Sequence, residues 1–366
     1  MYYIIFLSIL SLCLFESIFE RNKFKNVFFI ITGLLLFIIQ SFNTWAPDLD
    51  AYKIQFNYID KDFVRQLLEP VHVFLIEIVK NNSGHFNDFI FLYGVLIMIP
   101  FLYFIKKSSP LPVFVLSVFF ILPFFPDITQ IRNFLAFAVF FLALRFFHTN
   151  KIIFYSLYVL SIFCHYSLLV MAVFFIFRKL PFYNNTRKNN LIILIGVLIL
   201  IVTPKSIAST IVVSVNAKYD SYLEGTNTYI GTIVLFLPFF ILNSFVLYHY
   251  RKNKDFIENV VSDEYKKFIP LYIELITYAN YLILFQYFIR DFSRITMNLS
   301  VLSYIYLSIL LFYGYSKNST KWTGLCLRYG IYTWALFTFY ILFLLLNNGE
   351  YLKIIENTFS SNRLYG

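Results

Sequence analysis

The stretch 126–167, PDITQIRNFLAFAVFFLALRFFHTNKIIFYSLYVLSIFCHYS, contains two long apolar runs, and each carries a side chain that lipid alone would penalise. Arg132 stands at the mouth of the first run, and His165 lies in the middle of the second. A charged side chain at bilayer depth costs ~2.5 to 3.5 kcal/mol on insertion scales, so it usually faces a partner or a wet cavity. Arg132 and His165 are therefore the first candidates for a functional role.

The composition of the whole chain indicates an all-α, polytopic integral membrane protein. Of its 366 residues, 59% are hydrophobic and only 14% are charged, which is more apolar surface than a soluble domain of this size could bury. The net charge of +10 does not indicate nucleic acid, because charge in a membrane protein sorts by side. The three cysteines, Cys13, Cys164 and Cys326, lie in separate apolar runs without metal-ligand spacing, so we expect neither a disulfide framework nor a metal site.

Apolar runs divide the chain into about 12 predicted membrane segments, because most runs are long enough to cross a ~30 Å hydrocarbon core as helices. The run 152–177 is too long for one upright span, so we expect a helical hairpin with its polar tip near His165. The run 71–79 is too short to cross, and we expect a short interfacial helix there, after Glu69. The runs are 2–19, which we interpret as a retained first helix, 27–43, 89–105, 111–125, 131–147, 152–177, 191–203, 229–250, 268–289, 295–315 and 322–347.

The distribution of Lys and Arg predicts that both termini lie on the outer side of the membrane. With the hairpin counted as two segments, the inner loops hold more basic residues than the outer loops, as the positive-inside rule requires. The chain 1–366 then forms a single polytopic domain with outer segments at 44–88, 204–228 and 348–366. The first outer loop, the hairpin tip and the segment 290–294 all meet the same face.

Three arginines at the outer ends of helices predict an anion site. Guanidinium groups of Arg132, Arg290 and Arg294 could fork onto phosphate oxygens. The alternative is that they snorkel to the membrane boundary or pair with Asp127 and Asp291 nearby. Because all three stand against the positive-inside trend, we expect at least one of them to bind an anion.

The first outer loop supplies acidic and aromatic candidates. Asp48 and Asp50 could provide a general base or bind sugar, hold a metal, or only belong to a solvated loop. Glu69, before Pro70, could bind substrate or start the interfacial helix, since an acidic side chain near a helix N-terminus is favourable. Tyr52 could offer a sugar platform, although aromatic residues at this level are more often interface anchors.

The hairpin tip supplies His165 and Ser167. They could act as a proton carrier with an adjacent hydroxyl, or donate hydrogen bonds to a bound phosphate or sugar. The alternative is a buried histidine that closes the tip. As the acceptor base we rank Asp50 and Asp48 above His165, because a carboxylate in a wet loop is ionised without special tuning. A serine hydrolase is disfavoured because the chain lacks a G-x-S-x-G elbow.

At these residues the sequence resembles the EpsG-like branch of bacterial polysaccharide polymerases, which overlaps in role with the Wzy O-antigen polymerases. The resemblance rests on DLDAYKIQFNYI, LLEPVHVFL, QIRNFLAFAVFFLALRFF, FCHYS and RDFSR, and it reaches to about residue 315. It implies polymerisation of undecaprenyl-pyrophosphate-linked oligosaccharide repeats at the periplasmic face of the bacterial inner membrane, without a cofactor or metal. It also implies membrane lipid, a chain-length regulator and a flippase as partners, and no nucleic acid.

The resemblance implies roles for the candidate residues. Arginines would bind the pyrophosphate and stabilise its departure, while a carboxylate or His165 would take the acceptor proton. The catalytic candidates are Asp48, Asp50, His165 and Arg132, and the substrate-binding candidates are Arg132, Arg290, Arg294, Glu69, Tyr52, Ser167 and Asn133. Two other functions remain open: a flippase for lipid-linked oligosaccharides, and another membrane acyltransferase or glycosyltransferase with the same architecture.

Overall fold

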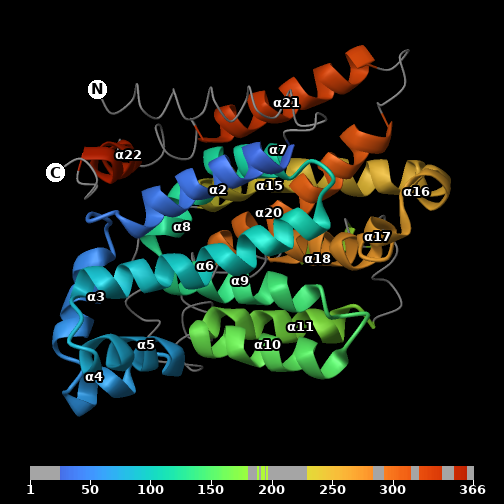
Figure 1. Ribbon diagram of the computed structural model, residues 1–366. Helices are drawn as coiled ribbons and strands as arrows, with labels where there is room; N and C mark the ends of the chain where they lie inside the picture. The colour runs from blue at the N-terminus through green and yellow to red at the C-terminus, as the bar shows by residue number, and fades with distance from the viewer. Residues whose placement is uncertain are drawn as a thin grey trace. The chain divides into compact units, whose positions relative to one another are not determined.

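The fold is seen in a computed structural model, which describes residues 25–179, 188, 191–193, 195–196, 229–282, 292–314, 321–339 and 350–360. The regular elements of these residues are helices, as the sequence predicts (Figure 1). The predicted first helix at 2–19, the outer loop 204–228 and Arg290 lie outside the described residues. The chain divides into two compact units, Met1–Leu169 with Ser308–Gly366, and Val170–Leu307.

Four helices form the body of the first unit. They are α2 (Lys25–Ser41), α6 (Phe86–Ser108), α9 (Ile131–Leu144) and α10 (Lys151–Cys164). Helix α6 packs between α2 and α9, and α10 packs on α9, so the four run side by side (Figure 1). At the end of α2, Ser41 lies so close to Gly94 of α6 that a Cβ at Gly94 would collide with it. This close approach fixes the crossing point of the two helices.

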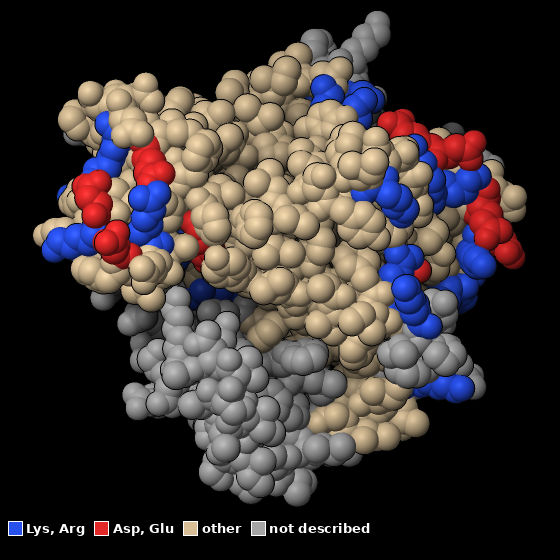
Figure 2. Space-filling view, turned by 90° about the horizontal axis from the view of Figure 1, so that it is seen from below, with Lys and Arg blue, Asp and Glu red and all other residues tan. Residues whose placement is uncertain are grey.

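The predicted outer segment 44–88 forms three short helices at one end of this body. They are α3 (Leu49–Asn57), α4 (Asp62–Gln66) and α5 (Pro70–Asn81). Surface ion pairs cross between them, Arg65 with Glu77 at 2.8 Å and Lys80 with Asp60 at 2.8 Å. Figure 2 shows the interspersed basic and acidic side chains of this segment at its left side. The prediction of a short helix after Glu69 is confirmed, and α5 packs on α10.

The apolar run 111–125 is not one continuous helix, in contrast to the prediction of a single membrane segment. It forms α7 (Pro112–Ile121) and begins α8 (Phe124–Thr129), with Leu122 extended between them at φ −159° and ψ 119°. Pro123 explains the break, because proline lacks an N–H for the helix and drives the preceding residue out of the helical conformation. The break sets the direction in which α8 leads into α9.

The predicted interruption near His165 is present. Helix α10 ends at Cys164, His165 is extended at φ −160° and ψ 124°, and a short 3-10 helix, η1 (Tyr166–Leu169), follows. The hydroxyl of Tyr158 donates to the carbonyl oxygen of Leu168 at 3.2 Å, so η1 folds back against α10. The tip of the predicted hairpin is therefore in the first unit, whereas the next helix, α11 (Val170–Phe177), belongs to the second.

The C-terminal part of the chain returns to the first unit. It contains the π-helical turn η3 (Leu310–Gly314), α21 (Lys321–Phe339) and α22 (Glu350–Ser360). Helix α21 packs on α7, where the rings of Phe114 and Tyr332 meet edge to face. Helix α22 reaches α8 through Phe359 and Phe125, whose ring centroids are 6.3 Å apart.

The second unit contains α11, α15 (Tyr229–Lys252), α16 (Lys254–Val260), α17 (Asp263–Lys266), α18 (Ile269–Tyr281) and most of α20 (Phe292–Ile309). Buried polar side chains join three of these helices: Asn243 Nδ2 donates to Asn280 Oδ1 at 3.1 Å, and Ser303 Oγ donates to Asn243 Oδ1 at 2.8 Å. Such bonds satisfy polar groups that lipid could not.

Two of the described helical stretches are long and apolar enough to cross a membrane, judged by length and composition alone: Phe86–Ser108 and Phe292–Gly314. Shorter apolar helices accompany them, among them α2, α7, α9 and α10. Large apolar side chains on the outside of α2 and α6, such as Leu34 and Ile99, are more than half exposed, as in helices that face lipid. The number of about 12 membrane segments stays a prediction.

Candidate functional site

The carboxylate of Glu69 is the centre of the candidate site. Its Oε2 accepts a hydrogen bond from Arg132 Nη1 at 2.6 Å, and its Oε1 lies 2.8 Å from His165 Nδ1. The Glu69 side chain is only 7% exposed, whereas those of Arg132 and His165 are 22% and 30% exposed. One buried acid therefore binds two partly accessible basic groups that come from different helices.

Pro70 determines the backbone conformation of Glu69. Glu69 is extended at φ −68° and ψ 143°, as expected for a residue before proline, and α5 starts with Pro70 in its first turn. Glu69 occupies the N-cap position, but its side chain makes no capping hydrogen bond. The expectation that Glu69 only stabilises the N-terminus of α5 is therefore incomplete, because its carboxylate binds Arg132 and His165 instead of capping the helix.

Arg132 lies in the first turn of α9, where a cation is disfavoured by the helix dipole. Glu69 offsets that cost, and it lies 63 residues from Arg132 along the chain, whereas sequence proximity suggested Asp127 as a partner. The guanidinium carbon also lies 5.3 Å from the centre of the Tyr52 ring on α3, within the range of a cation–π contact. Tyr52 and Glu69 together hold the Arg132 side chain in one orientation.

The electrostatics of the site keep Glu69 ionised. Burial acts to raise the pKa of Glu69, but the hydrogen bond from His165 and the positive charge of Arg132 outweigh it and lower the pKa to about 2. Burial raises the pKa of the Tyr52 hydroxyl to about 12, against the opposing charge of Arg132. At neutral pH the site therefore contains a carboxylate anion beside a neutral phenol.

The bond to Glu69 also selects the tautomer of His165. An ionised carboxylate can only accept hydrogen bonds, so Nδ1 of His165 must carry a hydrogen. In the neutral ring, Nε2 is then the nitrogen that can accept a proton, and the carboxylate stabilises the cation that results. This is the arrangement in which acid–histidine pairs serve as general bases.

Asn133 and Ser167 form a second polar pair. Asn133 follows Arg132 in the sequence, and Ser167 lies two residues after His165. Ser167 Oγ donates to Asn133 Oδ1 at 3.2 Å, which ties η1 to the first turn of α9. Asn133 is only 4% exposed, yet its Nδ2 has no hydrogen-bond partner, and neither has Nε of Arg132. Two donors on adjacent residues are therefore available to an acceptor group such as a phosphate oxygen.

The structure describes three of the remaining predicted site residues, Asp48, Asp50 and Arg294. Asp48 is half-buried at the N-cap position of α3, and its charge acts on Tyr52. Asp50 is exposed in the first turn of α3. Arg294 is half-buried in the first turn of α20, in the second unit, and Arg290 lies outside the described residues.

His72 is a site residue that the sequence analysis missed. It is fully buried on α5, and its ring nitrogens lie 2.7 Å from the Tyr93 hydroxyl and 3.0 Å from Gln55 Oε1. The available signal was a histidine inside the short apolar run 71–79. Among the described residues, no cluster of three or more His, Cys, Asp or Glu side chains could hold a metal ion.

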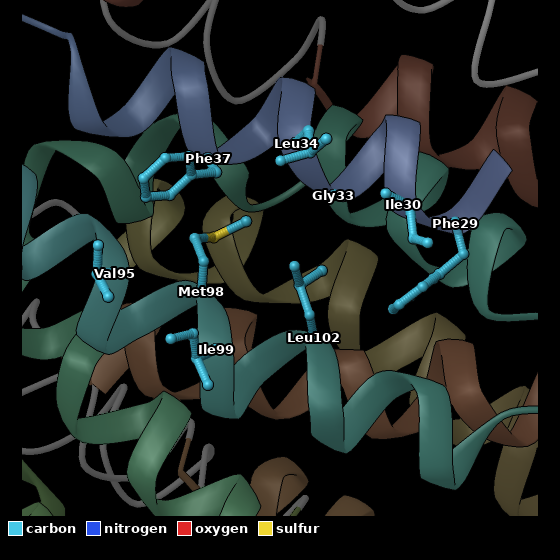
Figure 3. A pocket seen from close by; sticks show the side chains of 9 residues that line it. All are labelled: Phe29, Ile30, Gly33, Leu34, Phe37, Val95, Met98, Ile99 and Leu102. Atoms are coloured by element: carbon cyan, nitrogen blue, oxygen red, sulfur yellow. The ribbon is translucent and has the colours of Figure 1, made fainter. Parts of the chain in front are cut away.

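An apolar groove of about 300 Å³ lies between α2 and α6 (Figure 3). It uses a different face of α6 from the one that carries Tyr93. Its lining includes Gly33 and Phe37 of α2 with Val95 and Leu102 of α6. Two residues correspond to 200° around a helix, so Val95 points away from the side of α6 on which Tyr93 contacts His72. The groove is therefore separate from the polar site.

The apolar helices and the polar cluster at the ends of α5, α9 and α10 are features of a helical membrane protein with a charged site at one end of its helices. The chain belongs to the EpsG family, whose model matches residues 25–352. It is therefore a membrane protein of the polysaccharide polymerase type. No curated protein and no solved structure matches the chain.

Proposed function

We propose that this protein polymerises oligosaccharide repeats carried on undecaprenyl pyrophosphate, at the outer face of the bacterial inner membrane. The growing chain on one lipid carrier is transferred to a hydroxyl of another lipid-linked repeat, and undecaprenyl pyrophosphate is released. The observation that carries the proposal is the Glu69 carboxylate between Arg132 and His165, in a family of polysaccharide polymerases.

In this proposal His165 is the general base. Its Nε2 takes the proton of the acceptor hydroxyl as the oxygen forms a bond to the anomeric carbon of the donor sugar. Glu69 keeps Nδ1 protonated and stabilises the imidazolium, which later returns its proton to water. The structure adds this argument for His165, although Asp48 and Asp50 remain candidates for the same role.

Arg132 is the electrostatic group for the leaving phosphate. As the bond from the anomeric carbon to the phosphate oxygen breaks, its electron pair stays on the pyrophosphate, and a positioned guanidinium stabilises the charge that develops. The unpaired donors Arg132 Nε and Asn133 Nδ2, at the N-terminal end of α9, supply hydrogen bonds of the type that phosphate oxygens accept. Such stabilisation needs no metal.

An assay of lipid-linked intermediates in cells tests the proposal. Replacement of Arg132 or His165 should abolish polymer and leave single repeats on their lipid carrier at the outer face. Single repeats stranded at the inner face would identify a flippase instead. Transfer of an acyl group or of a single sugar, with polymer intact, would identify a different membrane transferase.

A further inference from the structure

One buried histidine joins α3, α5 and α6 beside the candidate site. His72 on α5 is 0% exposed, and its Nδ1 lies 2.7 Å from the hydroxyl of Tyr93 on α6. Its Nε2 lies 3.0 Å from Oε1 of Gln55 on α3. Both ring nitrogens are thus used, and each holds a different helix against α5.

The partners define the protonation of His72. Gln55 Oε1 is an acceptor, so Nε2 carries the hydrogen, and Nδ1 accepts the hydrogen of the Tyr93 hydroxyl. Burial, together with the positive charge of Arg132, lowers the pKa of His72 to about 3, against the opposing charge of Glu69. His72 is therefore neutral at physiological pH, and it cannot supply a charge or a proton to the reaction.

The ring of His72 also supports the residue on which Arg132 rests. The ring centroids of His72 and Tyr52 are 5.7 Å apart, and the guanidinium carbon of Arg132 is 5.3 Å from the centre of the Tyr52 ring. His72, Tyr52 and Arg132 are thus linked in series, and Arg132 then reaches Glu69. A displaced His72 ring would move the Tyr52 ring and, through it, the guanidinium.

We propose that His72 is a positioning residue of this site, an uncharged spacer that holds Tyr52 against Arg132 and so directs Arg132 to Glu69. Neutrality is part of the role, because a cation at His72 would compete with Arg132 for the buried carboxylate of Glu69. The titratable and charged groups around it are Tyr52 on α3, Tyr93 on α6, Glu69 at the start of α5, Arg132 on α9 and His165 at the end of α10. The effect on turnover rests on the proposed function.

The chain offers a matched control for the substitution. His249 Nδ1 lies 2.9 Å from the Tyr306 hydroxyl in the second unit, a similar histidine–tyrosine pair to which the proposed reaction assigns no role. We compare His72→Phe and Tyr93→Phe with His249→Phe and Tyr306→Phe. Purified protein is assayed for polymer formation, and its thermal unfolding in detergent is measured.

Positioning predicts a specific pattern in these variants. His72→Phe should lower turnover about tenfold to a hundredfold, because small displacements of a charge-stabilising group are costly, while the KM for the lipid-linked repeat changes little. His72→Gln should restore most of the turnover, since an amide can accept from Tyr93 and donate to Gln55. His249→Phe should lose no more thermal stability than His72→Phe but keep its turnover. Equal turnover in His72→Phe and His249→Phe would overturn the proposal.

A spectroscopic measurement tests the inference without the reaction. The chain has five histidines, so ¹⁵N-histidine labelling gives few signals, and the His72 signal is the one missing from His72→Gln. We expect a neutral ring with hydrogen on Nε2, unchanged from about pH 5 to pH 8. A ring that titrates in this range, or that carries its hydrogen on Nδ1, would reject the spacer role. A wild-type protein that makes no polymer would reject the proposed function instead, and the NMR result would still decide the state of His72.

Discussion

His165 Nδ1 lies 2.8 Å from Glu69 Oε1, although 96 residues separate the two along the chain. The contact joins the start of α5 to the end of α10, two points at which the backbone is extended rather than helical. In a regular helix the backbone fixes the direction of each side chain. Extended backbone at a helix end frees the side chain from that direction, so it can point toward a residue of another element. The interruptions at Pro70 and His165 are thus what allow the acid and the base to meet.

Glu69→Gln should unfold the site and stop polymer formation. The substitution leaves Arg132 without its anion, and removal of one partner of a buried ion pair typically costs about 3 to 5 kcal/mol. Glu77→Gln is the control, because Glu77 on the same helix pairs with Arg65 at the surface, where such a pair contributes about 0 to 1 kcal/mol. Thermal unfolding in detergent measures the difference, and equal losses in both variants would contradict a buried, structural role for Glu69.

The contribution of the ionised Glu69 carboxylate to the free energy of unfolding should be lost only at acidic pH. Its pKa of about 2 lies below the ordinary value of 4.5, so the folded state favours the ionised form. The contribution is therefore complete above about pH 4.5 and is lost as the pH falls toward 2. The difference in unfolding free energy between wild type and Glu69→Gln should not shrink as the pH falls from about 8 to about 5, and it should shrink below about pH 4.5. A difference that shrinks between pH 8 and pH 5 would show that Glu69 takes up a proton there.

The identity of the acceptor base is decided by amide substitutions. If His165 is the base, His165→Gln should abolish turnover while lipid-linked repeat still binds, because the amide can bind Glu69 but cannot take a proton. Asp50→Asn should keep its activity, since Asp50 is exposed on α3. A dead Asp50→Asn or Asp48→Asn variant that still binds substrate, with partial activity in His165→Gln, would return the role to a carboxylate.

Arg132→Lys should rescue little of the activity that Arg132→Ala loses. A lysine can pair with Glu69 as a point charge, but it lacks the planar fork that binds the carboxylate and a phosphate oxygen together. Arg65→Ala controls for the loss of a guanidinium from the same end of the first unit, since Arg65 on α4 forms a surface pair with Glu77. The measurement is polymer formed per mole of protein in membranes. Near-normal polymer in Arg132→Ala would reject the assignment of Arg132 to the pyrophosphate.

Cysteine labelling tests the predicted sidedness. In a background without Cys13, Cys164 and Cys326, Asp60→Cys should react with an impermeant reagent added outside, whereas Lys107→Cys should react only after permeabilisation. The physical reason is that the first outer segment and the inner end of α6 lie at opposite ends of that helix. Asn185→Cys tests the hairpin, which predicts that residue inside. Labelling of Asn185→Cys from outside would mean that 152–177 crosses once.

Local chemistry was enough to predict the short helix at Pro70 and the interruption at His165. The short helix at Pro70 follows from an apolar run too short to cross a membrane and from the proline at its start. The break at His165 follows from an apolar run too long for one span and from the polar residues in its middle. Both features are present. The continuous segment 111–125 was wrong because the weight of Pro123 was missed in an otherwise apolar run. These features depend on neighbours within a few residues, which sequence displays directly.

The sequence by itself determined the class of the protein, a helical membrane protein of the EpsG family, together with the residues Arg132, Glu69 and His165 as candidates. Only the tertiary structure decided that Glu69 binds both Arg132 and His165. Their contacts span 63 and 96 residues, and they depend on which faces of α5, α9 and α10 pack together. The same holds for His72, whose partners lie on α3 and α6. A side chain's residue type sets which bonds it can make, but the packing of distant helices selects the partner, since a buried polar group must pair with whatever the fold brings within reach.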